Sequence, residues 1–170
     1  GTGHGLGEPR HLDRLGVEPL TAQFALRPDW DAGQLEAILA DAALKPDLGE
    51  LTFVRIDAKG GRPIGAVAYY LRRGKVARVL QVPARPGQAG TVIDCLIGEA
   101  ARRGAVALRG RTQPALLEAM LGRRISFTHV ASTVAHSRDA ELMRACRDGE
   151  LFFNGVAGEN WSRLIGGSFD

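Results

Sequence analysis

A short glycine-rich segment between two apolar stretches carries the clearest chemistry in this sequence. Residues 83–90 read PARPGQAG and follow the strand-like VARVLQ of residues 76–81. After this segment, TVIDCLIGEAARR repeats its apolar residues at helical spacing. A strand that enters such a turn and opens a helix leaves backbone N–H groups unpaired at the positive end of the helix dipole. This pattern favours the binding of a phosphate or pyrophosphate, although glycine and proline also punctuate many strand–helix loops that bind nothing.

Side chains for proton transfer are few and scattered. Glu118 and His129 are the two candidates for a catalytic acid or base, and His136 is a further histidine in the same part of the chain. A single glutamate on an amphipathic helix is equally typical of a solvated face. Gln81, directly before the turn, cannot take a proton at neutral pH. The sequence therefore identifies no acid–base pair.

Two further groups invite a functional interpretation. Tyr69 and Tyr70 are neighbours in one expected strand, so one side chain points to each face of the sheet and one of them can border an acceptor pocket. Arg109 and Arg111 lie at the end of another expected strand, at a sheet edge where phosphates and carboxylates often bind. Packing explains the tyrosines and solvation explains the arginines equally well.

The cysteines and histidines do not predict a metal site. Cys95 and Cys146 are the only cysteines, and the four histidines lack ligand spacing. Both cysteines lie among apolar helical residues, so we expect small buried side chains in a reducing, cytoplasmic compartment.

Composition limits the classes of function. The chain has 170 residues, of which 45% are hydrophobic and 24% charged, and this composition fits a domain with one hydrophobic core. The sequence contains no apolar run long enough to span a membrane. A net charge of +3 without basic runs interleaved with aromatics argues against nucleic-acid binding. The chain starts at Gly1 without a methionine, so we expect one half of a larger protein that forms a homodimer or docks to a missing part of the parent chain.

The elements that position the turn follow from periodicity. We expect an irregular segment over residues 1–30 and one domain over residues 31–170, beginning with a helix capped by Asp31. The expected strands are 51–57, 64–73, 76–83, 105–109, 127–136 and 151–156. Helices are expected over 91–103, from Pro114 to Gly122, and from a Ser137 cap to Gly149. The predicted fold is a mixed α/β sheet, an antiparallel meander followed by a parallel βαβ crossover, with helices on both faces.

From about residue 31 to 136 this order resembles the acyl-CoA-binding core of the GNAT superfamily of N-acetyltransferases. The family's turn signature is Gln/Arg-x-x-Gly-x-Gly/Ala, which aligns with residues 85–90, RPGQAG. Arg85 and Gly90 match the signature, whereas Gln88 stands where the family has glycine. A Cβ at that position crowds the approach of a diphosphate to the backbone. The acidic residue before the turn and the tyrosine on the next helix, frequent in the family, have no counterpart here.

The resemblance implies an acyl-CoA-dependent N-acyltransferase with acetyl-CoA as co-substrate, no metal, and a small-molecule amine or peptide as acceptor. It implies that the cofactor contacts Gln81, Val82, Arg85, Gly87, Gln88, Ala89, Gly90 and Thr91. The alternative is a non-catalytic GNAT-like module that binds CoA or a partner while another part of the parent protein holds the chemistry.

Overall fold

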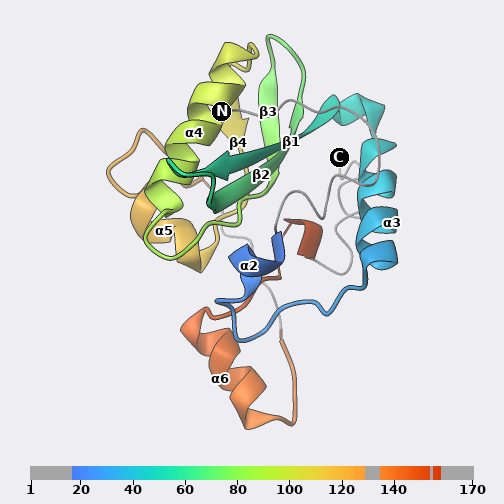
Figure 1. Ribbon diagram of the computed structural model, residues 1–170, viewed down its shortest axis with the longest axis vertical. Coiled ribbons are helices and arrows are strands. Elements are labelled where there is room, and N and C mark those ends of the chain that lie inside the picture. The colour runs from blue at the N-terminus through green and yellow to red at the C-terminus, as the bar shows by residue number, and fades with distance from the viewer. Residues whose placement is uncertain (1–16, 129–134, 154, 158–170) are drawn as a thin grey trace.

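A four-stranded sheet forms the centre of the computed structural model, which describes residues 17–128, 135–153 and 155–157 (Figure 1). The strands, adjacent in chain order, are β1 (Glu50–Asp57), β2 (Pro63–Leu71), β3 (Val76–Gln81) and β4 (Ala107–Arg109). The helices are α2 (Val17–Thr21), α3 (Ala32–Ala43), α4 (Ala89–Arg102), α5 (Pro114–Met120) and α6 (Ala140–Asp148), with 3₁₀ turns η2 (Pro46–Leu48) and η3 (Gly155–Ala157).

The sheet has the predicted mixed topology. Strands β1, β2 and β3 pair antiparallel, and β3 pairs parallel with β4 after the α4 crossover. Along β1, Thr52, Val54 and Ile56 are buried on one face, as strand alternation requires. The fold class expected from the sequence is therefore confirmed.

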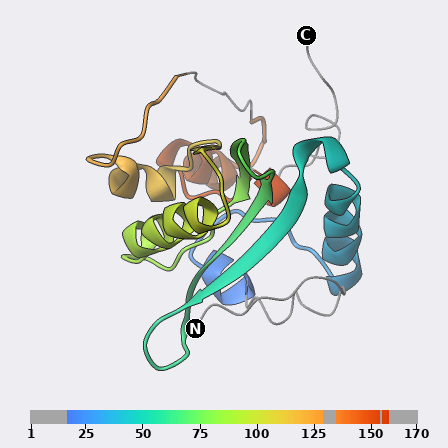
Figure 2. The same cartoon turned by 90° about the horizontal axis from the view of Figure 1, so that it is seen from above.

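Helices cover both faces of this sheet (Figure 2). On one face α4 and α5 pack over a core that contains Val67 and Tyr69 of β2. On the other face α3 packs over a smaller core that contains Tyr70 of β2 and Leu80 of β3. Successive residues of β2 thus supply both cores, which explains why this central strand is almost wholly buried.

Helix α3 begins where its cap was predicted. The Asp31 carboxylate accepts a hydrogen bond from the Gln34 N–H at 2.8 Å, and the Gln34 side-chain oxygen accepts one from the Asp31 N–H at 3.1 Å. This reciprocal capping box satisfies N–H groups that the first helical turn leaves unpaired. Leu39 and Ala42 are buried against the sheet.

Helix α4 buries a narrower face than the sequence suggested. Its buried residues are Val92, Ile93, Leu96, Glu99 and Ala100. Cys95, which was expected to be buried, and Ile97 are both exposed, because each lies about 100° around the helix from the centre of this face. Cys146 is half-buried. In α5, Leu116 is buried and Leu117 is exposed, as is Leu121 directly after the helix.

A buried carboxylate lies within the α4 face. Glu99, whose side chain is only 4% exposed, forms ion pairs with Arg102 and Arg103 at the end of the helix. Arg103 also donates a hydrogen bond from Nη1 to Thr52 Oγ1 at 2.8 Å. These contacts tie the end of α4 to β1 and supply the positive charge that a buried carboxylate requires.

The C-terminal third differs most from expectation. The predicted strand 127–136 is absent from its described residues, and 129–134 lie outside the described part of the chain. Instead of a strand over 151–156, Leu151 forms one parallel bridge with Leu26, and η3 follows. Asp139, rather than Ser137, caps α6, because its carboxylate accepts from the N–H of Glu141 at 2.8 Å. Gly149 ends α6 in the left-handed conformation, as predicted.

The N-terminal region contains more order than expected. Residues 17–21, predicted to be irregular, form the short helix α2, and Leu20 is fully buried. The domain division near residue 30 stays a prediction. Among the described residues, no helix has the length and apolarity needed to cross a membrane.

Candidate anion site at the start of helix α4

The segment between β3 and α4 is a tight turn that delivers the chain into a helix. The Gln88 N–H donates to the Arg85 carbonyl at 2.9 Å, which closes the turn. Gly87 adopts φ +75°, a left-handed conformation that side chains rarely tolerate. Helix α4 starts immediately afterwards at Ala89.

The first turn of α4 presents unpaired backbone donors. The N–H groups of Ala89, Gly90 and Thr91 have no intrahelical acceptor, since the first bond of the helix runs from the Val92 N–H to the Gln88 carbonyl at 3.0 Å. The Gln88 side chain occupies the N-cap position without capping any of them. These groups lie at the positive end of a 14-residue helix, where an anion is stabilised.

Two arginines flank this turn. Arg85 donates from Nε to the Pro63 carbonyl at 2.6 Å, which fixes the base of its guanidinium against the start of β2. Arg123, beyond α5 in sequence, lies over the first turn of α4, where a Cβ on Gly90 would be 2.9 Å from its Nη2. The turn therefore joins backbone donors with guanidinium groups from two separate segments.

Arg123 is held in place by a partner on α4. Its Nε and Nη2 donate to the two carboxylate oxygens of Asp94 at 2.8 and 2.9 Å. This bidentate hydrogen bonding lowers the pKa of the Asp94 carboxyl below its usual value and raises the pKa of Arg123. Arg123 also donates to the Ala119 carbonyl. Asp94 thus offsets the positive charge of Arg123. The guanidinium of Arg85 is therefore the more available of the two for binding an anion.

Strand β3 extends further along the sheet than its parallel neighbour β4. The parallel pairing of β3 with β4 stops at Arg78 and Arg109, whereas β3 continues to Gln81. Beyond that point, β3 meets η3, where the Val156 N–H donates to Gln81 Oε1 at 2.8 Å. The parallel pair in one sheet was predicted correctly, and the carboxyl half of β3 is left free of β4.

The residues predicted to bind a cofactor form one continuous stretch of this site. Gln81 and Val82 are buried at the end of β3, and residues 85–91 make the turn and the start of α4. Their role in binding stays a prediction. Sequence reasoning missed Arg123, because it reaches the turn only through the packing of α5 on α4.

The candidate acid–base residues do not gather at the turn. Glu118 is exposed on α5, His136 is exposed after a region that the structure does not describe, and His129 lies outside the described residues. Both tyrosines of β2 are buried, one on each face as predicted, and the Tyr70 hydroxyl donates to the Ala42 carbonyl at 2.6 Å.

The remaining candidates are also placed apart from the turn or from one another. Arg109 and Arg111 are exposed, and Arg109 is the register partner of Arg78. No cluster of three or more metal-binding side chains occurs within residues 17–128, 135–153 and 155–157.

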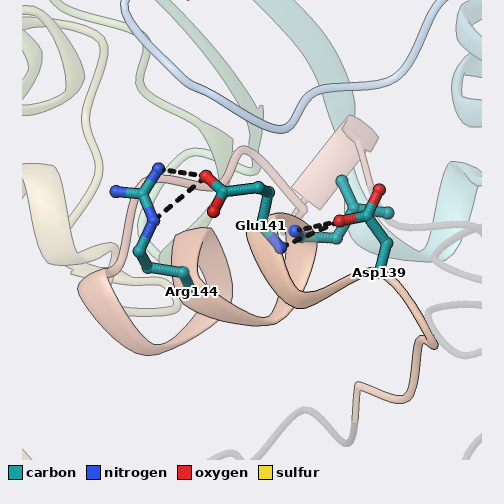
Figure 3. A network of polar contacts seen from close by, with 4 residues as sticks. Asp139, Glu141 and Arg144 are labelled. Carbon is teal, nitrogen blue, oxygen red and sulfur yellow. Dashed lines mark hydrogen bonds and ion pairs between the residues drawn. The ribbon is translucent and has the colours of Figure 1, made fainter.

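Helix α6 contains an arginine whose polar contacts are with its own helix, in contrast to the arginines at the turn (Figure 3). Arg144 pairs with Glu141 one turn earlier, with Nη2 2.5 Å from Oε2, while Asp139 caps the same helix. This pair lies on an exposed helix and is a suitable control for the arginines at the turn.

Comparison with known proteins gives two solved structures of similar fold. An acetyltransferase from Trypanosoma brucei aligns over 79% of this chain and 100% of its own, with a TM-score of 0.49 at 16% identity. The aminoglycoside antibiotic 6'-N-acetyltransferase AAC(6')-Ih from Acinetobacter baumannii aligns over 81% of this chain and 100% of its own, with a TM-score of 0.47 at 15% identity. No protein-family model and no curated protein matches the sequence.

Proposed function

We propose that this chain binds an acyl-CoA and transfers its acyl group to an amine. The observation that carries the proposal is the first turn of α4, with the N–H groups of Ala89, Gly90 and Thr91 free of intrahelical acceptors between Arg85 and Arg123. Backbone donors at a helix N-terminus, joined by guanidinium groups, suit an anion with several acceptor oxygens, such as a pyrophosphate.

The reaction needs little from the protein beyond positioning. The amine nitrogen attacks the thioester carbonyl carbon, a C–N bond forms, the C–S bond breaks, and CoA leaves as the thiolate. The amine loses one proton, which balances the proton that the thiolate gains. Holding the two reactants together supplies a large part of the barrier reduction. The acceptor in this proposal is a small-molecule amine or a peptide. Two free cysteines, with Cys95 exposed, suit a reducing cytoplasm.

A second candidate function is a CoA-binding module without catalysis. The exposure of Glu118 on α5 and of His136 in a loop favours it, because neither side chain is held against the turn. In this case acyl-CoA binds the same turn, and another part of the parent protein supplies the chemistry.

Calorimetry with acetyl-CoA and with desulfo-CoA, which lacks the thiol, tests the shared first step. We expect both ligands to bind, with an affinity that falls as salt rises. Arg85→Gln weakens binding by roughly tenfold, the typical value for a charged hydrogen bond. Arg144→Gln, on exposed α6, is the matched control and leaves the affinity unchanged. Folded protein that gives no heat with millimolar ligand refutes both candidates.

A further inference from the structure

Strand β4 is the last strand of the sheet and has an unpaired edge. In the strand order β1-β2-β3-β4 it has β3 on one side, and within the described ranges no strand pairs with its other side. After β4 the chain enters no helix or strand until α5 begins at Pro114. Alternate main-chain N–H and C=O groups of residues 107–109 therefore point away from β3, where they can pair with another strand.

The side chains of β3 and β4 alternate between a covered and an exposed face of the sheet. Val79 and Leu108 pack against the core beneath α4 and α5. Arg78 and Arg109, which are register partners, point the other way and are exposed. Arg78 is also the register partner of Tyr70, whose side chain lies in the core beneath α3. The arginine pair therefore lies on the exposed part of this face, beside the core beneath α3.

Positive charge is concentrated in this part of the sequence. Residues 72–111 contain nine lysines and arginines and two acidic residues. Both acidic residues lie on α4 and already form ion pairs with arginines. Among the described residues, Arg78, Arg109 and Arg111 form no ion pair. Uncompensated positive charge of this density attracts an anionic partner.

We propose that the edge of β4 docks an extended acidic segment of a partner protein, which adds to the sheet as a further strand. The main chain of the segment pairs with the outward-facing groups of residues 107–109, at about 4.8 Å from β4. Alternate side chains of the segment lie on the arginine side of the sheet, where carboxylates two residues apart meet Arg109 and Arg111. The inference does not depend on the proposed function, because the edge of β4 is not part of the anion site at the start of α4.

Charge and chemistry argue against three other occupants of this edge. A second copy of the chain would bring the same arginines, and like charges across an interface repel each other. Residues 127–136 of the same chain contain no acidic residue, so their docking would leave the arginines without partners. A nucleic acid stacks its bases on aromatic side chains, and Phe127 is the one aromatic residue among the exposed large hydrophobic residues of the described chain.

The first test is the affinity for an octapeptide of alternating glutamate and valine with blocked ends, measured by calorimetry. We expect binding that weakens as salt rises, and roughly threefold weaker binding for each of Arg109→Gln and Arg111→Gln, the value of an exposed ion pair. Arg144→Gln on α6 is the control and leaves the affinity unchanged. A peptide of the same composition with its glutamates in one block binds more weakly, because as a strand it cannot place all its carboxylates on one side. Equal affinity for the two peptides, or no binding at millimolar peptide, overturns the inference.

The second test separates strand pairing from charge attraction. In a strand, the N–H groups of alternate residues point to the same side, so methylating those of all glutamates or of all valines removes the donors on one side only. We expect one of the two methylated peptides to lose binding and the other to retain it. In ¹H–¹⁵N spectra the unmethylated peptide shifts the backbone signals of residues 107–111 and slows hydrogen exchange of the outward-facing amides. Equal binding by both methylated peptides, or shifts confined to other elements, overturns the inference.

Charge reversal gives a readout that loss of folding cannot imitate. The double variant Arg109→Glu with Arg111→Glu is expected to bind an alternating lysine–valine peptide more tightly than the glutamate peptide, the reverse of the parent protein. An oligothymidylate that displaces the glutamate peptide and binds more tightly assigns this surface to nucleic acid and overturns the inference. Concentration-dependent dimerisation that the glutamate peptide blocks also overturns it, because a second copy then occupies the edge.

Discussion

The Tyr70 hydroxyl makes a prediction that can be worked through in full. This residue of β2 is 1% exposed, and its hydroxyl donates to the Ala42 carbonyl at 2.6 Å in the last turn of α3. That carbonyl is among those without an intrahelical partner at a helix end. Tyr70→Phe removes the bond and leaves a buried acceptor unsatisfied, so we expect a loss of about 1.5 kcal/mol of unfolding free energy at pH 7.

The size of this loss depends on pH with a definite sign. Burial, and to a smaller extent the charge of Asp41, raises the pKa of Tyr70 from 10.0 to about 12. The unfolded chain therefore loses this proton first, and the native state is destabilised above pH 10. The contribution of the protonated Tyr70 hydroxyl to the free energy of unfolding is therefore complete below pH 10 and is lost as pH rises through 12. The cost is about 1.4 kcal/mol at pH 11 and about 2.3 kcal/mol at pH 12.

Phenylalanine cannot ionise, so the Tyr70→Phe variant does not show this alkaline loss of unfolding free energy. The stability curves of the parent protein and the variant are expected to cross near about pH 11, where the alkaline cost equals the value of the hydrogen bond. Urea unfolding followed by circular dichroism, repeated from pH 7 to pH 11.5, measures the difference. Other groups that titrate in this range are common to both proteins and cancel.

Tyr69→Phe is the matched control. Tyr69 is also fully buried, but its hydroxyl, which lies near Arg103, forms no hydrogen bond of ordinary geometry among the described residues. Its replacement therefore leaves stability at pH 7 unchanged or raises it. Equal stability of the parent protein and Tyr70→Phe at pH 7 shows that the bond to Ala42 does not form. A difference that stays constant to pH 11.5 shows that the hydroxyl is not buried.

Three further predictions concern α4 and activity. Arg103→Met removes a partner of buried Glu99 and the donor to Thr52, and we expect a loss of about 2–3 kcal/mol of unfolding free energy, measured by urea unfolding. This loss is smaller than that for a fully unpaired buried charge, because Arg102 still pairs with Glu99. Arg144→Met on α6 is the control and should change the unfolding free energy little. Gln88→Gly removes the Cβ at the α4 N-cap and should tighten acetyl-CoA binding in calorimetry, whereas an unchanged affinity contradicts the idea that this side chain obstructs the turn. Acyl transfer, measured by thiol release, should be slow and rise with pH as free amine accumulates. A bell-shaped profile that collapses in Glu118→Gln or His129→Ala would identify a base that we did not find, since such a base is typically worth about 10²–10⁴-fold.

Local signals were enough to predict the parts of the molecule that depend on neighbours in sequence. The change of apolar period near residue 91 located α4, alternation located the meander, and Asp31 located the start of α3. Each of these depends on residues within about one or two turns of chain, so the pattern is readable without the fold. The glycine-rich turn belongs to the same class, since Gly87 and the helix behind it define its geometry.

Only the tertiary structure decided which side chains from distant segments meet. Arg123 reaches Gly90 because α5 packs on α4, and Gln81 is oriented by Val156, 75 residues later in the chain. The same limit explains the errors. Residues 151–156 were predicted as a strand, but Leu151 forms only a single bridge, with Leu26. Cys95 lies at the edge of a buried helix face whose width depends on the sheet beneath it. The sequence determines the periodicity of each element, whereas burial and contact depend on which surfaces the other elements cover.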